Sequence, residues 1–302
     1  MLHDALVVGG SFAGLSAALQ IARARRNVRV IDSGLPRNRF AVAAHGFFGH
    51  DGSAPRAMIA SAQTQLQRYP NAHVVAGRAE SARAVDDGFE LTLADGETLR
   101  ARKLVLAFGI TDVLPELPGL SERWGRSVLH CPYCHGFEFS GQRLGVLHSA
   151  SFSPHKALLV ADWGPTTLFL NGNEYPDQDT LAKLAQRGVA IEAAPIAQLQ
   201  GSAPALSGVR LADGRELGID ALFVASRTRF NSPIAEQLGC ELDDGLLGPV
   251  VRTDESKQTT VAGVYAAGDI ARPMHNATWA SADGVTAGSS LHQSLVFGPL
   301  AA

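Results

Sequence analysis

The stretch Gly9-Gly10-Ser11-Phe12-Ala13-Gly14 decides the fold of this chain. A short apolar run over residues 5–8 precedes it, residues 15–26 have helical spacing, and residues 28–32 have the character of a second strand. A strand, a glycine turn, a helix and a strand that ends in an acidic residue together form a βαβ unit. The sequence therefore predicts an α/β protein with a Rossmann-like, dinucleotide-binding unit at its start.

This glycine stretch fits a G-x-G-x-x-G frame in which Ser11 replaces the second glycine. Gly9 permits the tight turn, a small residue at position 11 lets a pyrophosphate approach the backbone, and Gly14 lets the helix pack on the strand. The helix N-terminus then faces the phosphates, and Asp32 can accept hydrogen bonds from a ribose. An ordinary glycine-rich turn is the alternative, but the complete strand, helix, strand and acid favour dinucleotide binding.

A second nucleotide-binding signal lies near the C-terminus, where the apolar residues 263–267 lead into Gly268 and Asp269 and then into an Ala/Gly-rich helix. Asp269 can bind a ribityl hydroxyl, and the helix can point its positive end at the pyrimidine side of a flavin. Simple N-capping is the alternative for Asp269. The full set of predicted cofactor contacts is Gly9, Gly10, Ser11, Phe12, Ala13, Gly14, Asp32, Arg37, Arg39, Gly268, Asp269, Ala277 and Thr278.

The remaining segments predict two α/β units. In the first half we expect a functional loop, a helix, a small antiparallel sheet and a further buried strand, over residues 36–55, 57–70, 73–107 and 104–109. A second block alternates strands (144–147, 167–170, 221–225) with helices (154–161, 179–188). Since residues 263–269 return to the style of the first block, we expect a discontinuous domain over 1–113 and 241–302, interrupted by a second Rossmann-like domain over 114–240.

Composition limits the class of protein. The 302 residues are 46% hydrophobic and 18% charged with a net charge of −3, which suits two globular domains and gives no electrostatic case for nucleic acid. No apolar run reaches the roughly 18 residues of a membrane span. Residues 1–4 lack a basic segment, so we expect a cytoplasmic protein. Only three cysteines are present, which excludes a disulfide scaffold.

Two of the cysteines lie in Cys131-Pro132-Tyr133-Cys134-His135. This C-x-x-C-H pattern is compatible with zinc, with haem attachment and with thiol–disulfide exchange. Zinc needs four ligands, and the remaining Cys240 is more simply a small buried residue. Haem attachment would need export, for which there is no signal peptide. The pattern therefore favours redox exchange without a metal.

The order of these motifs along the chain resembles low-molecular-weight thioredoxin reductase. Residues 32–39 and 130–136 look more like one branch, the FAD-dependent dithiol oxidases that close disulfides in gliotoxin, holomycin and romidepsin. The resemblance implies an FAD domain interrupted by a pyridine-nucleotide domain, and a homodimer. It also implies that Cys134 is the flavin-proximal thiolate and that Cys131 exchanges with substrate.

Histidines replace the usual acid beside the redox pair. Reductases carry an acidic residue directly after the second cysteine, whereas this chain has His135, which can take a proton from an incoming thiol near neutral pH. His130 is a second candidate base. In the loop, His45, Phe47, Phe48 and His50 either line a substrate cleft or form a packed loop.

The second block departs from the reductases. Residues 145–154 lack the glycine that lets a pyrophosphate lie against backbone, and residues 170–174 offer Glu174 instead of an arginine pair for a 2′-phosphate. We predict a remnant domain, with weak NADH binding as the alternative. Electrons would then enter from a small-molecule dithiol, or a thioredoxin-like protein, and leave to O2 as H2O2. The alternative functions are an NAD(P)H-dependent disulfide reductase and a redox sensor without turnover.

Overall fold

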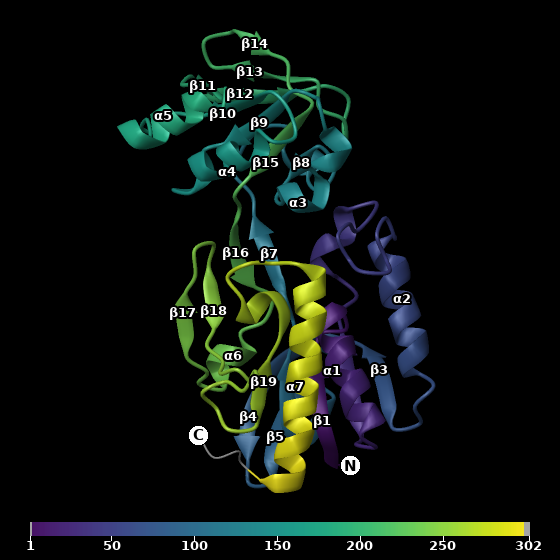
Figure 1. Ribbon diagram of the computed structural model, residues 1–302. Helices are drawn as coiled ribbons and strands as arrows, with labels where there is room; N and C mark the ends of the chain where they lie inside the picture. The colour runs from purple at the N-terminus through teal and green to yellow at the C-terminus, as the bar shows by residue number, and fades with distance from the viewer. Residues whose placement is uncertain (1, 299–302) are drawn as a thin grey trace.

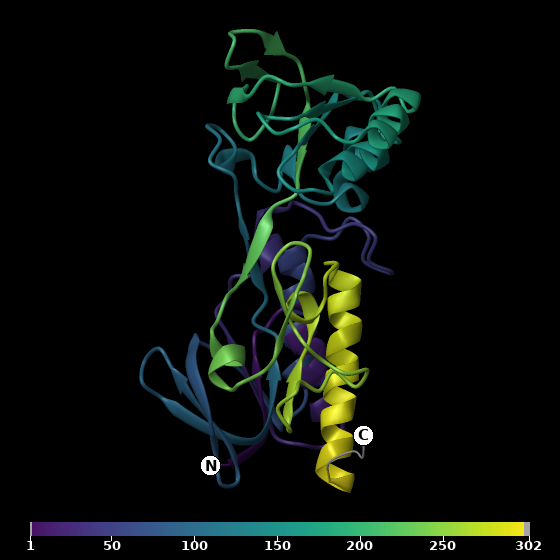
Figure 2. The same ribbon diagram turned by 90° about the vertical axis from the view of Figure 1, so that its left-hand side faces the viewer.

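The computed structural model describes residues 2–298 and contains two α/β units placed end to end (Figures 1 and 2). The second unit is inserted between strands β7 (Ile110–Val113) and β16 (Arg227–Phe230). These two strands pair antiparallel and connect the units. The fold class predicted from the sequence, two Rossmann-like units of which the first is discontinuous, is confirmed. Within residues 2–298, no helix is both long and apolar enough to cross a membrane.

A seven-stranded sheet forms the core of the first unit, in the order β3-β2-β1-β6-β5-β4 with β19 beside β6. The elements of this sheet and its helices are β1 (Leu2–Val8), α1 (Phe12–Arg23), β2 (Val28–Asp32), η1 (Arg37–Phe40), α2 (Pro55–Leu66), β3 (Ala72–Ala76), β4 (Ala79–Val85), β5 (Gly88–Leu93), β6 (Thr98–Leu106), β19 (Val264–Ala266), η4 (Gly268–Ala271) and α7 (Ala277–Phe297). Leu6 and Val8 face one apolar cluster and Ala5 and Val7 face another, so both faces of the sheet are buried.

The prediction of a small antiparallel sheet over residues 73–107 is only partly correct. Strands β4, β5 and β6 are antiparallel, but β3 pairs parallel with β2, as α2 carries the chain back to the same end of the sheet. Residues 104–106 are not a separate strand but the second half of β6, which pairs with β1 and β19. Strand direction depends on these distant partners, and the alternation of apolar residues does not encode it.

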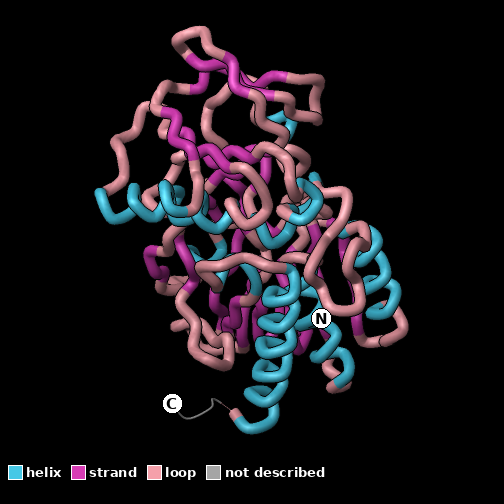
Figure 3. Tube along the Cα trace, turned by 45° about the horizontal axis from the view of Figure 1, so that its top comes forward, coloured by secondary structure: helices cyan, strands magenta, loops and turns pink. Residues whose placement is uncertain are grey.

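Helices α1 and α7 lie side by side, and both begin at the end of the sheet that faces the second unit (Figures 1 and 3). Their contact is made by backbone and small side chains. A Cβ on Gly284 would come within 2.1 Å of the carbonyl oxygen of Ala13, and one on Gly288 within 2.5 Å of that of Ala17. The Ala/Gly-rich composition of α7 therefore brings two helix N-termini to one place.

The second unit has a parallel sheet in the order β11-β10-β9-β15-β8, with a three-stranded antiparallel sheet beside it. Its elements are η2 (Ser121–Arg123), β8 (Val128–Leu129), α3 (Pro132–His135), η3 (Phe137–Phe139), β9 (Leu144–Leu147), α4 (Ser153–Val160), β10 (Thr166–Phe169), α5 (Gln178–Gln186), β11 (Ala190–Glu192), β12 (Ile196–Gln200), β13 (Gly208–Leu211), β14 (Glu216–Leu217) and β15 (Ala221–Val224).

The chain returns to the first unit before residue 241. After β16 come α6 (Ile234–Gln237), β17 (Leu242–Asp244) and β18 (Pro249–Val251). Ile234, Ala235 and Cys240 are buried in the same apolar cluster as β4, β5 and β6. We therefore propose that the second domain boundary lies near residue 226, at the start of β16, instead of the expected 240.

Candidate active site

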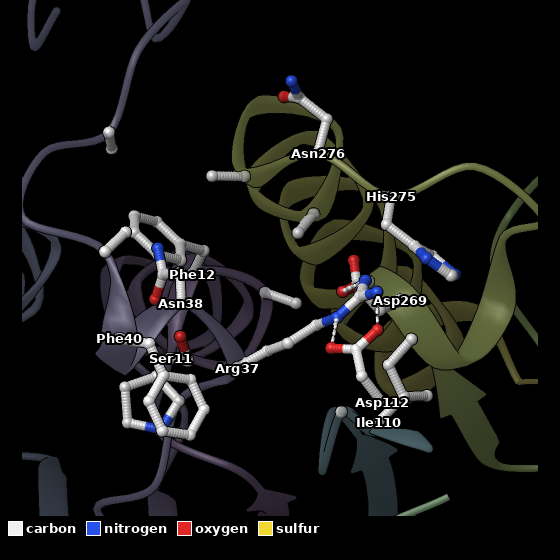
Figure 4. Close-up of a pocket in the computed structure, with 18 of the residues that line it drawn as sticks. Ser11, Phe12, Arg37, Asn38, Phe40, Ile110, Asp112, Asp269, His275 and Asn276 are labelled. Atoms are coloured by element: carbon white, nitrogen blue, oxygen red, sulfur yellow. Dashed lines mark hydrogen bonds and ion pairs between the residues drawn. The ribbon is translucent and has the colours of Figure 1, made fainter. Parts of the chain in front are cut away.

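A cavity lies at the carboxyl ends of β1, β6 and β19, where α1 and α7 begin, and part of its wall is shown in Figure 4. It brings together most of the residues predicted from the sequence. Those in its lining are Gly9, Gly10, Ser11, Phe12, Ala13, Asp32, Arg37, His130, Cys131, Cys134, His135, Gly268, Asp269 and Ala277. Gly14, Arg39 and Thr278 lie outside the lining.

The glycine turn leaves no room for side chains. Gly9 has a φ of +115°, and a Cβ there would lie 2.1 Å from the carbonyl oxygen of Ala107. A Cβ on Gly10 would lie 2.5 Å from the Cβ of Asp32, and one on Gly14 would lie 1.8 Å from the carbonyl oxygen of Gly9. None of these three positions therefore has room for a side chain, because the turn lies in close contact with the end of β6, with β2 and with its own backbone.

The N-terminus of α1 is open toward the cavity. The side chain of Ser11, its N-cap residue, makes no capping hydrogen bond, so the first backbone N–H groups of the helix can receive a phosphate. Asp32, at the end of β2, accepts hydrogen bonds from the backbone N–H of Gly34 (3.0 Å) and from Nε2 of Gln63 (3.4 Å). These residues fit the pyrophosphate and ribose of a dinucleotide.

Arg37 is held by two carboxylates at the centre of this wall (Figure 4). It donates to Asp112 through Nε (2.8 Å) and NH2 (2.6 Å), and to Asp269 through NH1 (3.0 Å). Burial alone would lower the pKa of Arg37, but its hydrogen bonds and charge interactions with Asp112 and Asp269 together outweigh burial and raise it. Likewise, burial would raise the pKa of Asp112, but the hydrogen bonds and charge of Arg37, together with the hydrogen bond from Ser226, lower it.

Both loop arginines, Arg37 and Arg39, were predicted from the sequence to contact the cofactor, and in the structure both bind other groups of the protein. The guanidinium of Arg37 joins η1 to β7 and η4 instead of pointing free into the cavity. Arg39 donates to the carbonyl of Pro36 (3.0 Å) and lies 4.3 Å from the centre of the Phe40 ring, and it is not itself part of the cavity lining. The backbone N–H of Thr278 is capped by the side chain of Asn276 (2.7 Å).

The redox pair faces the same cavity. Cys131 and Cys134 form a disulfide with a Cα–Cα separation of 5.3 Å, at the start of the short helix α3. Burial lowers the pKa of His135, and the nearby carboxylate of Glu138 opposes that effect. Nε2 of His45, from the loop of the first unit, lies 3.3 Å from Oε1 of Glu138. The two units thus meet at the disulfide.

The chain matches the family model of the pyridine nucleotide-disulphide oxidoreductases over residues 3–148 and 177–284. It belongs to this family. It is also similar to the thioredoxin reductase sirT of Leptosphaeria maculans, with 35% identity over 310 residues that cover 96% of this chain and 94% of the relative. The resemblance to thioredoxin reductase predicted from the sequence is confirmed.

Two solved structures share the whole architecture. An oxidoreductase from Agrobacterium tumefaciens is 45% identical, with a TM-score of 0.95 and coverage of 99% of this chain and 100% of that one. HlmI is 36% identical, with a TM-score of 0.91 and coverage of 98% and 93%. The chain is therefore a thioredoxin reductase-like, FAD-dependent disulfide oxidoreductase, and the glycine turn, Asp32 and the cavity fit FAD as its cofactor.

Sequence reasoning missed several residues of this oxidoreductase's cavity. Asp112 lies in β7, 75 positions from the arginine that it binds, and no local pattern marks it. His275 and Asn276 also line the cavity, and Asn276 is the N-cap of α7. Asparagine before an Ala-rich helix is a recognisable start signal, so this segment could have been found.

The loop that was expected either to line a cleft or to pack on itself does both. His45 lines the cavity. Phe47 packs on Phe12, with 6.0 Å between ring centres, and on His50 at 5.7 Å. The Phe48 side chain is 96% exposed. The loop therefore contributes one histidine to the site and anchors itself through one phenylalanine.

A second cavity of about 460 Å³ adjoins the first between the loop and the second unit. His45 and His135 lie in the walls of both cavities. Phe139 and Leu206 add apolar surface to it, and Arg126 lies in its wall. Its volume lies in the range of small-molecule sites in proteins, about 300–1,000 Å³.

The turn after β9 in the second unit is filled by its own side chains. Oγ of the fully buried Ser153 accepts hydrogen bonds from the backbone N–H groups of Ser149 (3.2 Å) and Ala150 (3.1 Å). In a Rossmann-like unit, the N–H groups of this turn face a bound pyrophosphate. Here two of them already have an acceptor within the protein. Across residues 2–298, no group of three or more His, Cys, Asp or Glu side chains is placed to hold a metal ion.

Proposed function

We propose that this oxidoreductase is a dithiol oxidase that closes a disulfide in a small-molecule dithiol and passes the electrons through FAD to O2, releasing H2O2. The observation that carries the proposal is the filled turn after β9, where Ser153 occupies the N–H groups that a nicotinamide dinucleotide would need. The exposed Glu174 after β10 adds a negative charge where a 2′-phosphate would bind. A homodimer and a cytoplasmic location, expected from the resemblance and the sequence, are part of the proposal.

The adjoining cavity of about 460 Å³ supports a small molecule as substrate. It reaches the redox helix through His135 and has room for a compact dithiol, whereas a folded thioredoxin needs an open surface. Tyr133, between the two cysteines, and Phe137, just after them, are 70% and 81% exposed and can contact a larger substrate.

The exchange steps follow from the chemistry of the disulfide. A substrate thiolate attacks Sγ of Cys131, which forms a mixed disulfide and releases Cys134 as a thiolate. The second substrate thiolate attacks the substrate sulfur of that mixed disulfide, so the cyclic product leaves and Cys131 becomes a thiolate. His135 takes the proton of the incoming thiol. Bound FAD would supply the two-electron acceptor that restores the Cys131–Cys134 bond, and Gly9, Gly10 and Asp32 would hold it.

Anaerobic titration separates this proposal from an NAD(P)H-dependent reductase. We expect dithiothreitol to bleach the flavin absorbance, and air to restore it with release of H2O2. NADPH and NADH should leave the spectrum unchanged over the same time. Rapid bleaching by either nucleotide would contradict the proposal and favour the reductase that the relatives' names suggest. Bleaching by dithiol without repeated turnover in air would favour a redox sensor.

The pH profile tests the role of His135. Because burial lowers the pKa of His135 below its ordinary value of 6.5, the neutral base persists into mildly acidic solution. We expect kcat/KM for a dithiol to fall only below pH 6.5 in the parent enzyme. His135→Gln should lose about a hundredfold in kcat/KM and lose that acid limb. An unchanged acid limb in the variant would assign the proton to another group.

A further inference from the structure

Two histidines that are far apart in sequence stack on each other in the wall of the FAD cavity. His130 directly precedes Cys131, and His275 directly precedes the N-cap of α7. Their ring centres are 6.3 Å apart and their planes are inclined by 30°. His275 is drawn beside Asp269 in Figure 4, and both rings line the same cavity as the disulfide.

Each ring has a buried nitrogen without a partner. Nδ1 of His130 and Nδ1 of His275 are inaccessible to solvent and make no hydrogen bond to any residue in the range 2–298. A buried polar atom that stays without a hydrogen-bond partner destabilises the folded protein. Two such atoms in one cavity indicate that both rings form their hydrogen bonds with what the cavity holds, or that they exchange protons there.

Burial lowers the pKa of both rings, and the surrounding charges act on them in both directions. Burial is the largest cause of the lowered pKa of each ring. The charge of Arg37 in η1 lowers both pKa values further, and that of Lys156 in α4 lowers the pKa of His130. Asp269 in η4 raises the pKa of His275, Asp112 in β7 raises both pKa values, and a hydrogen bond with the backbone of Arg272 also raises that of His275. Two neighbouring rings beside two cations cannot both be protonated easily, so the pair holds at most one proton.

Lys156 connects His130 to the parallel sheet of the second unit. Its Nζ donates to the backbone carbonyls of His130 (3.0 Å) and Val224 (3.2 Å), at the carboxyl ends of β8 and β15. Burial lowers the pKa of Lys156 to about 8, and the carboxylate of Asp112 opposes that effect. The position of His130, and with it the start of the redox helix, therefore depends on a buried cation.

We propose that His130 and His275 act as a pair that takes up one proton when electrons enter the FAD cavity and returns it when they leave. Oxidation of a dithiol to a disulfide releases two electrons and two protons. At neutral pH, two electrons and one proton pass to FAD, which leaves one proton over. Electrons in the cavity add negative charge, and nearby negative charge favours protonated imidazole.

The pair thus holds the second proton until a two-electron acceptor takes both electrons and both protons, which for O2 gives H2O2. His130 lies next to the cysteine that exchanges with substrate, and His275 lies at the start of the helix that faces the flavin site. The role of the histidine pair rests on the FAD of the proposed function but not on oxygen as the acceptor. The pair can therefore be absent in an active dithiol oxidase, and it can be present in an enzyme that uses another acceptor.

The number of protons taken up on reduction tests the pair. We would use the FAD-loaded Cys131→Ser, Cys134→Ser protein, in which FAD is the one group that accepts electrons. It would be reduced electrochemically in weakly buffered anaerobic solution at pH 7, and the uptake followed with an indicator dye. We expect about two protons per FAD in this parent and about one after adding His275→Gln, because linkage counts every group whose pKa rises on reduction.

The shared proton makes a non-additive prediction. His130→Gln, and the variant with both histidines replaced, should each show the same loss of one proton as His275→Gln. His292→Gln, which changes a histidine within α7 that lies outside the cavity lining, should leave the uptake unchanged. An unchanged uptake in His275→Gln, or losses that add in the double variant, would overturn the proposal.

A second measurement needs no variant, so it remains possible if the histidine variants lose FAD. Histidine proton resonances of the unchanged full-length protein can be titrated in the oxidised and the reduced states. We expect the titrations of two coupled rings to move to higher pH on reduction and to account for one proton between them. Two histidines that stay neutral at pH 7 in both states would overturn the proposal without any variant.

Discussion

Replacing Cys131 with serine is expected to lower dithiol turnover by about a thousandfold or more while FAD stays bound. Cys131 and Cys134 form one disulfide, and removal of one member of a catalytic unit removes the whole reaction path. The serine is close in size, and the glycine turn and Asp32, which we propose as the FAD site, belong to the other unit. The measurement is steady-state oxidation of dithiothreitol, with flavin absorbance per chain as the check on FAD content.

The two single cysteine variants are not equivalent. If Cys134 is the flavin-proximal thiolate, Cys131→Ser should develop a long-wavelength absorbance between thiolate and flavin that disappears as the pH falls. Cys134→Ser should lack this band. The reverse pattern would exchange the two roles. Cys240→Ser is the control, because Cys240 is buried behind the sheet of the first unit, 3.5 Å from Oγ1 of Thr259, and should retain turnover.

The glycine turn and the cysteine pair could be predicted from the sequence because residues close together in the chain determine their geometry. The turn at residues 9–14 needs glycine for contacts with β1, β2 and the end of β6, and spacing alone identifies it. The two cysteines are close by covalent spacing. The partner of Arg37 was not readable, since Asp112 comes near it only after the chain has traversed the whole first sheet. Charged loop residues can be recognised in a sequence, but their partners depend on tertiary structure.

The same distinction holds in the second unit. The sequence shows that a glycine is missing after β9, and this loss predicts poor nucleotide binding. It does not show that Oγ of Ser153 accepts hydrogen bonds from the two N–H groups of the turn. Nor does it show that Oγ of Ser149 donates to the carbonyl of Ala225 (3.0 Å), just after β15, and accepts from the N–H of the same residue (3.2 Å). These bonds give the turn internal partners for groups that a pyrophosphate would otherwise satisfy. The loss of nicotinamide binding stays a prediction until it is titrated.

Gly14→Ala should produce the largest structural effect of any single methyl group in the FAD site. The added Cβ would lie 1.8 Å from the carbonyl oxygen of Gly9 and 3.2 Å from Cγ1 of Val7, and the first of these contacts is with rigid backbone. Helix α1 would have to move away from β1, which also disturbs its close contact with α7. We expect the purified variant to lack FAD and to lose about 3 kcal/mol in its free energy of unfolding.

Gly77→Ala is the matched control for that variant. Gly77 follows β3 in the same unit, has no positive φ, and an added Cβ would find nothing closer than Leu93 at 3.8 Å. This exchange should change the free energy of unfolding by less than about 0.5 kcal/mol and keep the flavin content. Equal FAD content in both variants would mean that α1 can shift without loss of the cofactor. In that case the glycine at position 14 would serve only the packing of α1 on the sheet, and the phosphate site would depend on the turn at Gly9 and Gly10 alone.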